Sequence, residues 1–135
     1  MVTFTSRAIT DTAKMAYKHL PNSKSIIPIK ETLYNIDNAK SRAVLVEGIM
    51  DVWRIGDGAV CSFGTQLTNE QKALLATTFD TLFILFDADA TAKAVRLGNY
   101  FEQIMDHVEV IPIDEGDPAD HSYEEVRSLK IDLKL

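Results

Sequence analysis

Acidic side chains directly follow or lie shortly after three apolar runs of the sequence. Carboxylates gathered in this way can bind a divalent cation. Glu47 follows the first run, Asp87 and Asp89 follow the second, and Asp117 follows the third. Two like charges about 4 Å apart repel by roughly 1 kcal/mol in water and about 4 kcal/mol at an effective dielectric of 20. A hard cation removes that repulsion, and Mg²⁺ typically takes one or two carboxylates together with substrate phosphates. We therefore expect a Mg²⁺ (or Mn²⁺) site that handles phosphate groups.

The apolar runs themselves are typical of buried strands in a parallel sheet. Residues 43–46, 82–86 and 108–113 are almost continuously apolar, as in strands that are covered on both faces. In open α/β sheets, ligands bind beyond the carboxyl ends of the strands. The three clusters of carboxylates would therefore lie at that edge and meet in one cleft.

Strands and helices alternate through most of the chain. Strands are expected at about 43–47, 59–63, 81–86 and 107–112, helices near 50–55, 69–77, 90–106 and 123–129, and a last short strand over 131–135. Two capping boxes mark helix starts, Thr68 with Gln71 and Ser122 with Glu125. Gly98, inside the longest helix, costs about 1 kcal/mol relative to alanine. The pattern predicts an α/β fold with a mainly parallel four-stranded sheet flanked by helices.

Residues 1–42 differ from the remainder in charge. They carry seven basic and three acidic side chains, a balance of +4, whereas residues 43–135 carry seven basic and seventeen acidic ones, a balance of −10. We expect a short basic N-terminal segment, 1–42, attached to an α/β domain, 43–135. The segment is either an ordinary solvated surface or a basic arm beside an acidic, metal-binding body.

Composition narrows the class of protein. A length of 135 residues with 46% hydrophobic and 25% charged content suits a single globular domain. No apolar run reaches the 18 or so residues that span a bilayer, and the start lacks a signal-peptide pattern, which favours a cytoplasmic location without membrane partners. The lone Cys61 excludes an internal disulfide and a zinc finger, and we expect a buried, inert thiol.

Each acidic position also has an ordinary structural alternative. Gly48 lets the backbone approach a ligand, but Glu47-Gly48 can equally be a turn glycine beside a surface glutamate. Asp51 can be an exposed helix carboxylate, Asp89 can cap the helix that follows it, and Asp120 can help to cap the next one. A shared site is favoured because all three acidic clusters follow a predicted strand, and three independent coincidences are less probable than one site.

These residues, in this order, resemble a Toprim domain, the metal-binding module shared by bacterial-type primases, topoisomerases and several nucleases. The Toprim pattern has Glu-Gly after the first strand, matched here by Glu47-Gly48, and Asp-x-Asp after a later one, matched by Asp87 and Asp89. A Gly-x-Asp-Pro-Asp-like segment often lies beyond, and residues 116–120 read Gly-Asp-Pro-Ala-Asp. The resemblance covers roughly residues 43–125.

The primase branch is the most similar. Residues 46–52 are similar to its Glu-Gly-x-x-Asp-Val segment, residues 62–68 to its Gly-Thr-x-Leu-Thr stretch, and residues 4–39 to the part of a primase upstream of Toprim. The chain departs from that branch at Ser6, where a glycine is expected, and at Ala16, where a lysine is expected. It also reads Asp-Ala-Asp-Ala-Thr-Ala where Asp-Gly-Asp-Arg-Ala-Gly is common, which removes a basic side chain near the metal.

The resemblance implies a DNA primase-like module that joins nucleotides on a DNA template in a bacterial or phage-infected cell. Its ligands would be nucleoside triphosphates, the DNA template and the RNA or DNA product, with other replication proteins as further partners. The implied roles are metal binding by Glu47, Asp87, Asp89 and Asp117, with Glu47 as ligand or general base; phosphate binding by Arg7, Lys14 and Lys18; and support from Gly48, Asp51 and Asp120.

Two alternatives stay open beside primase chemistry. The same metals could activate water, giving a nuclease that cleaves phosphodiesters. The chain could instead be a non-catalytic metal- or nucleotide-binding module of a larger replication protein. The sequence shows no zinc-binding or helicase portion, so we expect either a piece of a larger primase, whose full activity needs further segments, or a small stand-alone relative.

Overall fold

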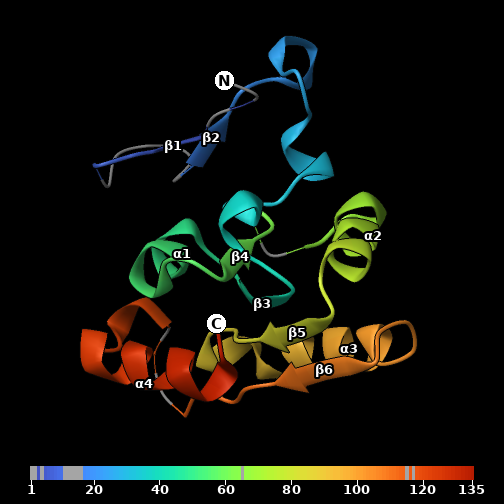
Figure 1. Ribbon diagram of the computed structural model, residues 1–135. Coiled ribbons are helices and arrows are strands. Elements are labelled where there is room, and N and C mark those ends of the chain that lie inside the picture. The colour runs from blue at the N-terminus through green and yellow to red at the C-terminus, as the bar shows by residue number, and fades with distance from the viewer. Residues whose placement is uncertain (1–2, 4, 11–16, 65, 115, 117) are drawn as a thin grey trace.

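A four-stranded parallel sheet forms the centre of the molecule. The computed structural model describes all residues except 1–2, 4, 11–16, 65, 115 and 117. The sheet has the order β4-β3-β5-β6 and every neighbouring pair is parallel (Figure 1). Its strands are β3 (Arg42–Val46), β4 (Ala59–Cys61), β5 (Thr81–Ile84) and β6 (His107–Val110). The predicted α/β class with a four-stranded parallel sheet flanked by helices is confirmed.

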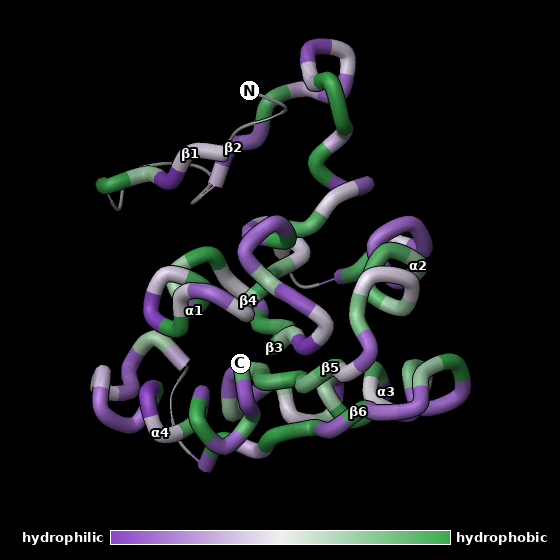
Figure 2. The backbone as a smooth tube through the Cα atoms, in the orientation of Figure 1, coloured by the Kyte–Doolittle hydropathy of each residue, from purple (hydrophilic) through white to green (hydrophobic). Residues whose placement is uncertain are grey.

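Helices cover both faces of this sheet. They are α1 (Ile49–Ile55), α2 (Asn69–Thr78), α3 (Thr91–Phe101) and α4 (Tyr123–Leu133). Ala43 and Leu45 pack on the side of α2 and α3, whereas Val44 and Val46 pack on the side of α1 and α4. Hydrophobic residues are concentrated along the central strands (Figure 2). Within the described ranges, no helix combines the length and the apolarity that crossing a bilayer requires.

The buried side chains make this sheet a firm support for its carboxyl edge. The fully buried residues include Leu45, Leu75, Leu82, Ile84 and Phe101. Each such side chain contributes roughly 1.5–3 kcal/mol through removal from water. The loops that leave the strand ends therefore start from fixed positions.

Local sequence signals set the starts of two helices. The Gln71 N–H donates to Thr68 Oγ1 at 3.2 Å, and the Thr68 N–H donates to Gln71 Oε1 at 3.1 Å. Ser122 and Glu125 exchange the same pair of bonds at 3.3 and 2.8 Å. Both predicted capping boxes are confirmed.

Two predicted ends are wrong. The short strand expected over 131–135 does not form, because α4 continues to Leu133. Val126 and Leu133, two turns apart, pack against the α1 side of the sheet, and that contact stabilises the longer helix. The helix expected over 90–106 ends at Phe101, where the Ile104 and Met105 N–H groups both donate to the Phe101 carbonyl and tighten the chain into a turn.

The N-terminal segment is a hairpin followed by short 3₁₀ turns. Strands β1 (Thr5–Arg7) and β2 (Tyr17–His19) pair antiparallel, and η1 (Asn22–Lys24), η2 (Ile29–Glu31) and η3 (Ile36–Asn38) follow. The hairpin projects away from the sheet (Figure 1). Ile29 and Leu33, in contrast, are buried, and Leu33 belongs to the core on the α2 side. The last part of the segment is thus attached to the body, while the boundary at 42/43 stays a prediction.

Candidate functional site at the carboxyl edge of the sheet

Glu47 and Asp87 leave neighbouring strands at the same edge of the sheet. β3 and β5 are parallel, with Leu45 opposite Ile84. The ladder continues past the strand end, because the Leu85 N–H donates to the Leu45 carbonyl at 2.9 Å. Glu47 lies two residues beyond Leu45, and Asp87 lies three residues beyond Ile84. The structure therefore brings the first two predicted acidic segments to one edge.

A lysine that the sequence analysis did not select joins these two segments. Lys93, in the first turn of α3, places its Nζ 3.1 Å from Glu47 Oε1. The same ammonium lies 4.9 Å from the centre of the Phe86 ring. The Glu47 side chain is only 15% exposed, so this ion pair offsets part of the cost of burying its charge. No local pattern in the sequence indicates this pairing, because the two residues are 46 positions apart.

The third acidic segment lies beside the second. The Ala88 N–H donates to the Gly116 carbonyl at 3.1 Å. Gly116 has φ +76°, and a side chain there would meet Asp120 Oδ2 at 2.9 Å, so the turn requires glycine. The following turn, η5 (Pro118–Asp120), contacts α1, where Arg54 Nε donates to the Ala119 carbonyl at 3.0 Å. Asp117, the predicted metal ligand of this segment, lies outside the described residues.

Asp51 has a structural role at this edge. It is 5% exposed, and its Oδ2 accepts a hydrogen bond from the Gly48 N–H at 2.9 Å. The alternative of an exposed helix carboxylate is therefore wrong. A Cβ at position 48 would lie 3.0 Å from the same oxygen, so glycine keeps this cap in place. The cap fixes the start of α1 directly after Glu47 and so positions Glu47.

Neither Asp89 nor Asp120 caps the helix that follows it. Asp89 is exposed in the 3₁₀ turn η4 (Ala88–Ala90), and the N-cap of α3 is Ala90, which makes no side-chain cap hydrogen bond. The N-cap of α4 is Ser122 rather than Asp120. The Asp89 carboxylate is thus available to a ligand at the edge.

The donors suit a hard cation in type but do not form a ready-made cage. Among the residues that the structure describes, no group of three or more His, Cys, Asp or Glu side chains could hold a metal ion as they stand. Glu47 is engaged by Lys93, and a further predicted donor is not described. Carboxylate oxygens from adjacent strand ends are nevertheless the donors that Mg²⁺ prefers. Lys93 contacts Glu47 Oε1, so its ammonium would compete with an ion bound by the same carboxylate.

Lys30, a second lysine outside the predicted site residues, holds the loop after β4. Lys30 Nζ donates to the carbonyls of Ser62, Phe63 and Gln66 at 3.2, 3.3 and 3.3 Å. Burial lowers the pKa of Lys30. Phe63 has φ +56°, and its ring meets His19 of β2 edge-on at 6.3 Å between centroids. This loop therefore links the N-terminal segment to the body.

The predicted phosphate-binding residues lie on the N-terminal hairpin. Arg7 and Lys18 are both exposed, and the Arg7 guanidinium lies 5.8 Å from the centre of the Tyr17 ring. Lys14 lies outside the described residues. The hairpin thus presents positive charge to solvent.

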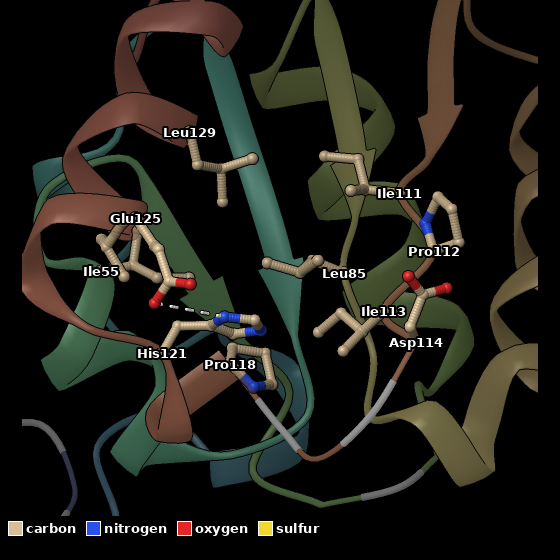
Figure 3. Close-up of a pocket in the computed structure, with 11 residues that line it drawn as sticks. Ile55, Leu85, Ile111, Pro112, Ile113, Asp114, Pro118, His121, Glu125 and Leu129 are labelled. Carbon is tan, nitrogen blue, oxygen red and sulfur yellow. Dashed lines mark ion pairs between the residues drawn. The ribbon is translucent and has the colours of Figure 1, made fainter.

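An apolar cavity of about 520 Å³ lies between α4 and the segment after β6. Figure 3 shows Leu85, Ile111 and Leu129 pointing into it, and the His121 Nδ1 to Glu125 Oε2 pair, at 3.8 Å, beside it. Within the described part of the chain, no predicted site residue lines this cavity. Leu85 and Ile111 follow the ends of β5 and β6, so the cavity lies near the same edge, but its wall is mostly apolar.

Cys61 is fully buried in β4, and burial raises the pKa of its thiol to about 11. The expectation of a buried thiol is confirmed.

This chain shares its fold with solved structures of primase catalytic domains. The Aquifex aeolicus primase, in a structure of its zinc-binding and RNA polymerase domains, superposes with a TM-score of 0.78 at 25% identity, covering 97% of this chain and 36% of that one. The catalytic domain of a DnaG primase bound to single-stranded DNA has a TM-score of 0.72 at 21% identity, covering 98% of this chain and 46% of that one. At 21% identity the likeness shows the fold alone.

Curated relatives are DNA primases. The DNA primase of Halalkalibacterium halodurans is 34% identical over 90% of this chain, and that of Enterococcus faecalis is 37% identical over 50% of it. The chain spans 22% and 13% of the length of these two proteins. No protein-family model matches the sequence.

Proposed function

We propose that the chain is a primase-type Toprim module that transfers nucleotides to a growing strand on a DNA template. The observation that carries this proposal is the convergence of three acidic segments at one edge of the sheet. Lys93 pairs with Glu47 across two segments, and the Ala88 N–H to Gly116 carbonyl bond joins the second segment to the third. The similarity to DNA primases supports this chemistry over others available to the fold.

The site residues would have different roles in phosphoryl transfer. Asp87, Asp89 and Asp117 would hold Mg²⁺ or Mn²⁺, with Glu47 as a further ligand or as the general base. A bound divalent ion neutralises the triphosphate and stabilises the charge that develops during transfer. Glu47, as base, would accept the proton of the attacking hydroxyl. Asp51 would keep Glu47 in place through the cap on Gly48.

Positive charge on the N-terminal segment supplies the contacts to nucleic acid. Arg7, Lys14 and Lys18 would hold phosphates of the template or product, and their binding would weaken as salt rises. The segment 1–42 would thus act as a strand-holding arm on the Toprim domain, 43–135. Nucleoside triphosphates are the co-substrate in this scheme, and other replication proteins are candidate partners.

One alternative has an observation in its favour. The chain spans 22% of the length of a related DNA primase, which keeps a non-catalytic metal- and nucleotide-binding module of a larger replication protein as the second candidate. The same carboxylates could also activate water in a nuclease. Metal and nucleotide binding without synthesis or cleavage would indicate the module, and cleavage of labelled DNA without synthesis would indicate the nuclease.

The Asp89→Asn variant tests the site. We expect it to lose most Mn²⁺ binding in an electron paramagnetic resonance titration while its melting temperature stays that of the parent, because Asp89 is exposed. Asp132→Asn, which changes another exposed aspartate, on α4, is the matched control and should bind Mn²⁺ normally. Incorporation of labelled nucleotides on a DNA template should fall together with metal binding. Unchanged Mn²⁺ binding by Asp89→Asn would refute the site.

A further inference from the structure

A basic groove of about 290 Å³ lies between α2 and α3. We call it the α2–α3 groove; its polar lining is Lys72 of α2, Lys93, Arg96 and Tyr100 of α3, and Gln66 of the loop before α2. None of the lining residues in the described part of the chain is acidic. Three cations in one groove stand out in a chain of net charge −6.

The α3 side of the groove is one face of the helix. Lys93, Arg96 and Tyr100 follow one another at spacings of three and four residues, which places them in a row. At 1.5 Å per residue the row is about 10 Å long. Lys72 faces it from α2, with its Nζ 4.5 Å from the centre of the Tyr100 ring. Tyr100 itself is 42% exposed, so part of the ring is open to a ligand.

One end of the groove meets the carboxyl edge of the sheet. Lys93 lines the groove and also pairs with Glu47 at 3.1 Å. Along the chain, Asp89 precedes Lys93 by four residues, directly before α3. A negatively charged ligand lying along the row would therefore have one end beside the acidic segments.

We propose that the α2–α3 groove binds the phosphate backbone of a single-stranded nucleic acid and leads that strand to the carboxyl edge. Lysine and arginine side chains bind successive phosphates, and an exposed aromatic ring stacks with an unpaired base. A row of about 10 Å is long enough for two successive phosphates of one strand. The inference rests on the proposed function, since it identifies the strand that the carboxyl edge acts on. It adds a surface distinct from the N-terminal hairpin.

The double variant Lys72→Gln, Arg96→Gln tests the groove. Binding of a fluorescent 12-nucleotide single-stranded DNA is measured by anisotropy in EDTA, over a range of salt concentrations. We expect affinity at 0.1 M salt to fall roughly tenfold or more, because two charge-assisted contacts are lost. The slope of log K against log salt should become shallower by about 1.4, since each phosphate contact to a single strand contributes about 0.7.

Matched variants distinguish the loss of contacts in the groove from a general loss of positive charge on the surface. Arg127→Gln, Lys134→Gln removes two exposed cations from the C-terminal helix and its end, and it should leave the slope unchanged. Lys72→Arg, Arg96→Lys preserves charge and should retain binding. Tyr100→Leu removes the ring and should weaken single-strand binding without changing the slope.

Three results with DNA would overturn the inference. They are an unchanged slope in the groove variant, an equal loss in the α4 control, and binding of a duplex of the same length that is as tight and as sensitive to the groove substitutions. A nucleoside triphosphate whose binding, rather than that of the strand, depends on Lys72 and Arg96 would also overturn it. Because EDTA removes divalent ions, this outcome is independent of the Asp89→Asn metal titration. Failure of the groove and failure of the proposed function can thus be told apart.

Discussion

Gly98→Ala tests how closely α3 packs on the sheet, and α3 carries both Lys93 and the α2–α3 groove. A Cβ at position 98 would lie 2.6 Å from Val110 Cγ2, whereas ordinary contacts begin at 3.4 Å. The Val110 methyl and the α3 backbone would have to move apart by about 0.8 Å. Such overpacking costs typically 1–3 kcal/mol, while alanine gains about 1 kcal/mol over glycine in a helix. The net expectation is a loss of between about 0 and 2 kcal/mol.

Thermal and urea unfolding measure this change. For 135 residues, an unfolding entropy of about 2.1 cal/mol/K per residue converts 1 kcal/mol into roughly 3–4 °C. The variant should therefore melt as much as about 7 °C below the parent. In a Val110→Ala background the clashing methyl is gone, so the same substitution should now stabilise by about 1 kcal/mol. Stabilisation by Gly98→Ala in both backgrounds would refute the close packing.

Three further predictions concern single side chains. Lys93→Gln should tighten Mn²⁺ binding about two- to fivefold in an equilibrium titration, because the ion no longer competes with an ammonium whose pairing with Glu47 contributes up to about 1 kcal/mol; weaker binding would contradict this. The pKa of His19 is lowered, first by burial and then by the Lys30 charge, so stability should fall as pH drops from about 6.5 toward the folded pKa. The melting temperature of the parent should decline over that window more than that of His19→Asn, and equal declines would count against a lowered pKa of this partly buried imidazole. Cys61 should stay unmodified by a thiol reagent at pH 8 until urea unfolds the chain, because burial raises its pKa to about 11.

Features encoded in a few neighbouring residues were predictable. The strands appear as apolar runs because both sheet faces are covered, and Ala43 and Val44 indeed pack on opposite sides. The caps at Thr68 and Ser122 were predictable because a capping box closes within four residues. The position of the acidic segments at one edge of the sheet was predictable because the carboxyl ends of parallel strands lie at the same edge.

Features that depend on distant contacts were not predictable. Lys93 meets Glu47 across 46 positions, and no local pattern encodes that pairing. Gly98 was interpreted only as a cost to its helix, whereas the structure relates it to Val110 on β6. The end of α4 depends on packing of Leu133 against the sheet, which periodicity in a short C-terminal stretch did not reveal.

The central claim is that three acidic segments meet around one ion, and paramagnetic broadening by Mn²⁺ tests it most directly. In amide spectra of the ¹⁵N-labelled chain, traces of Mn²⁺ should broaden the signals of Gly48, Ala88 and Gly116 together and leave that of Ser128, on α4, sharp. Broadening of only one of the three segments, or of an unrelated surface, would contradict the account.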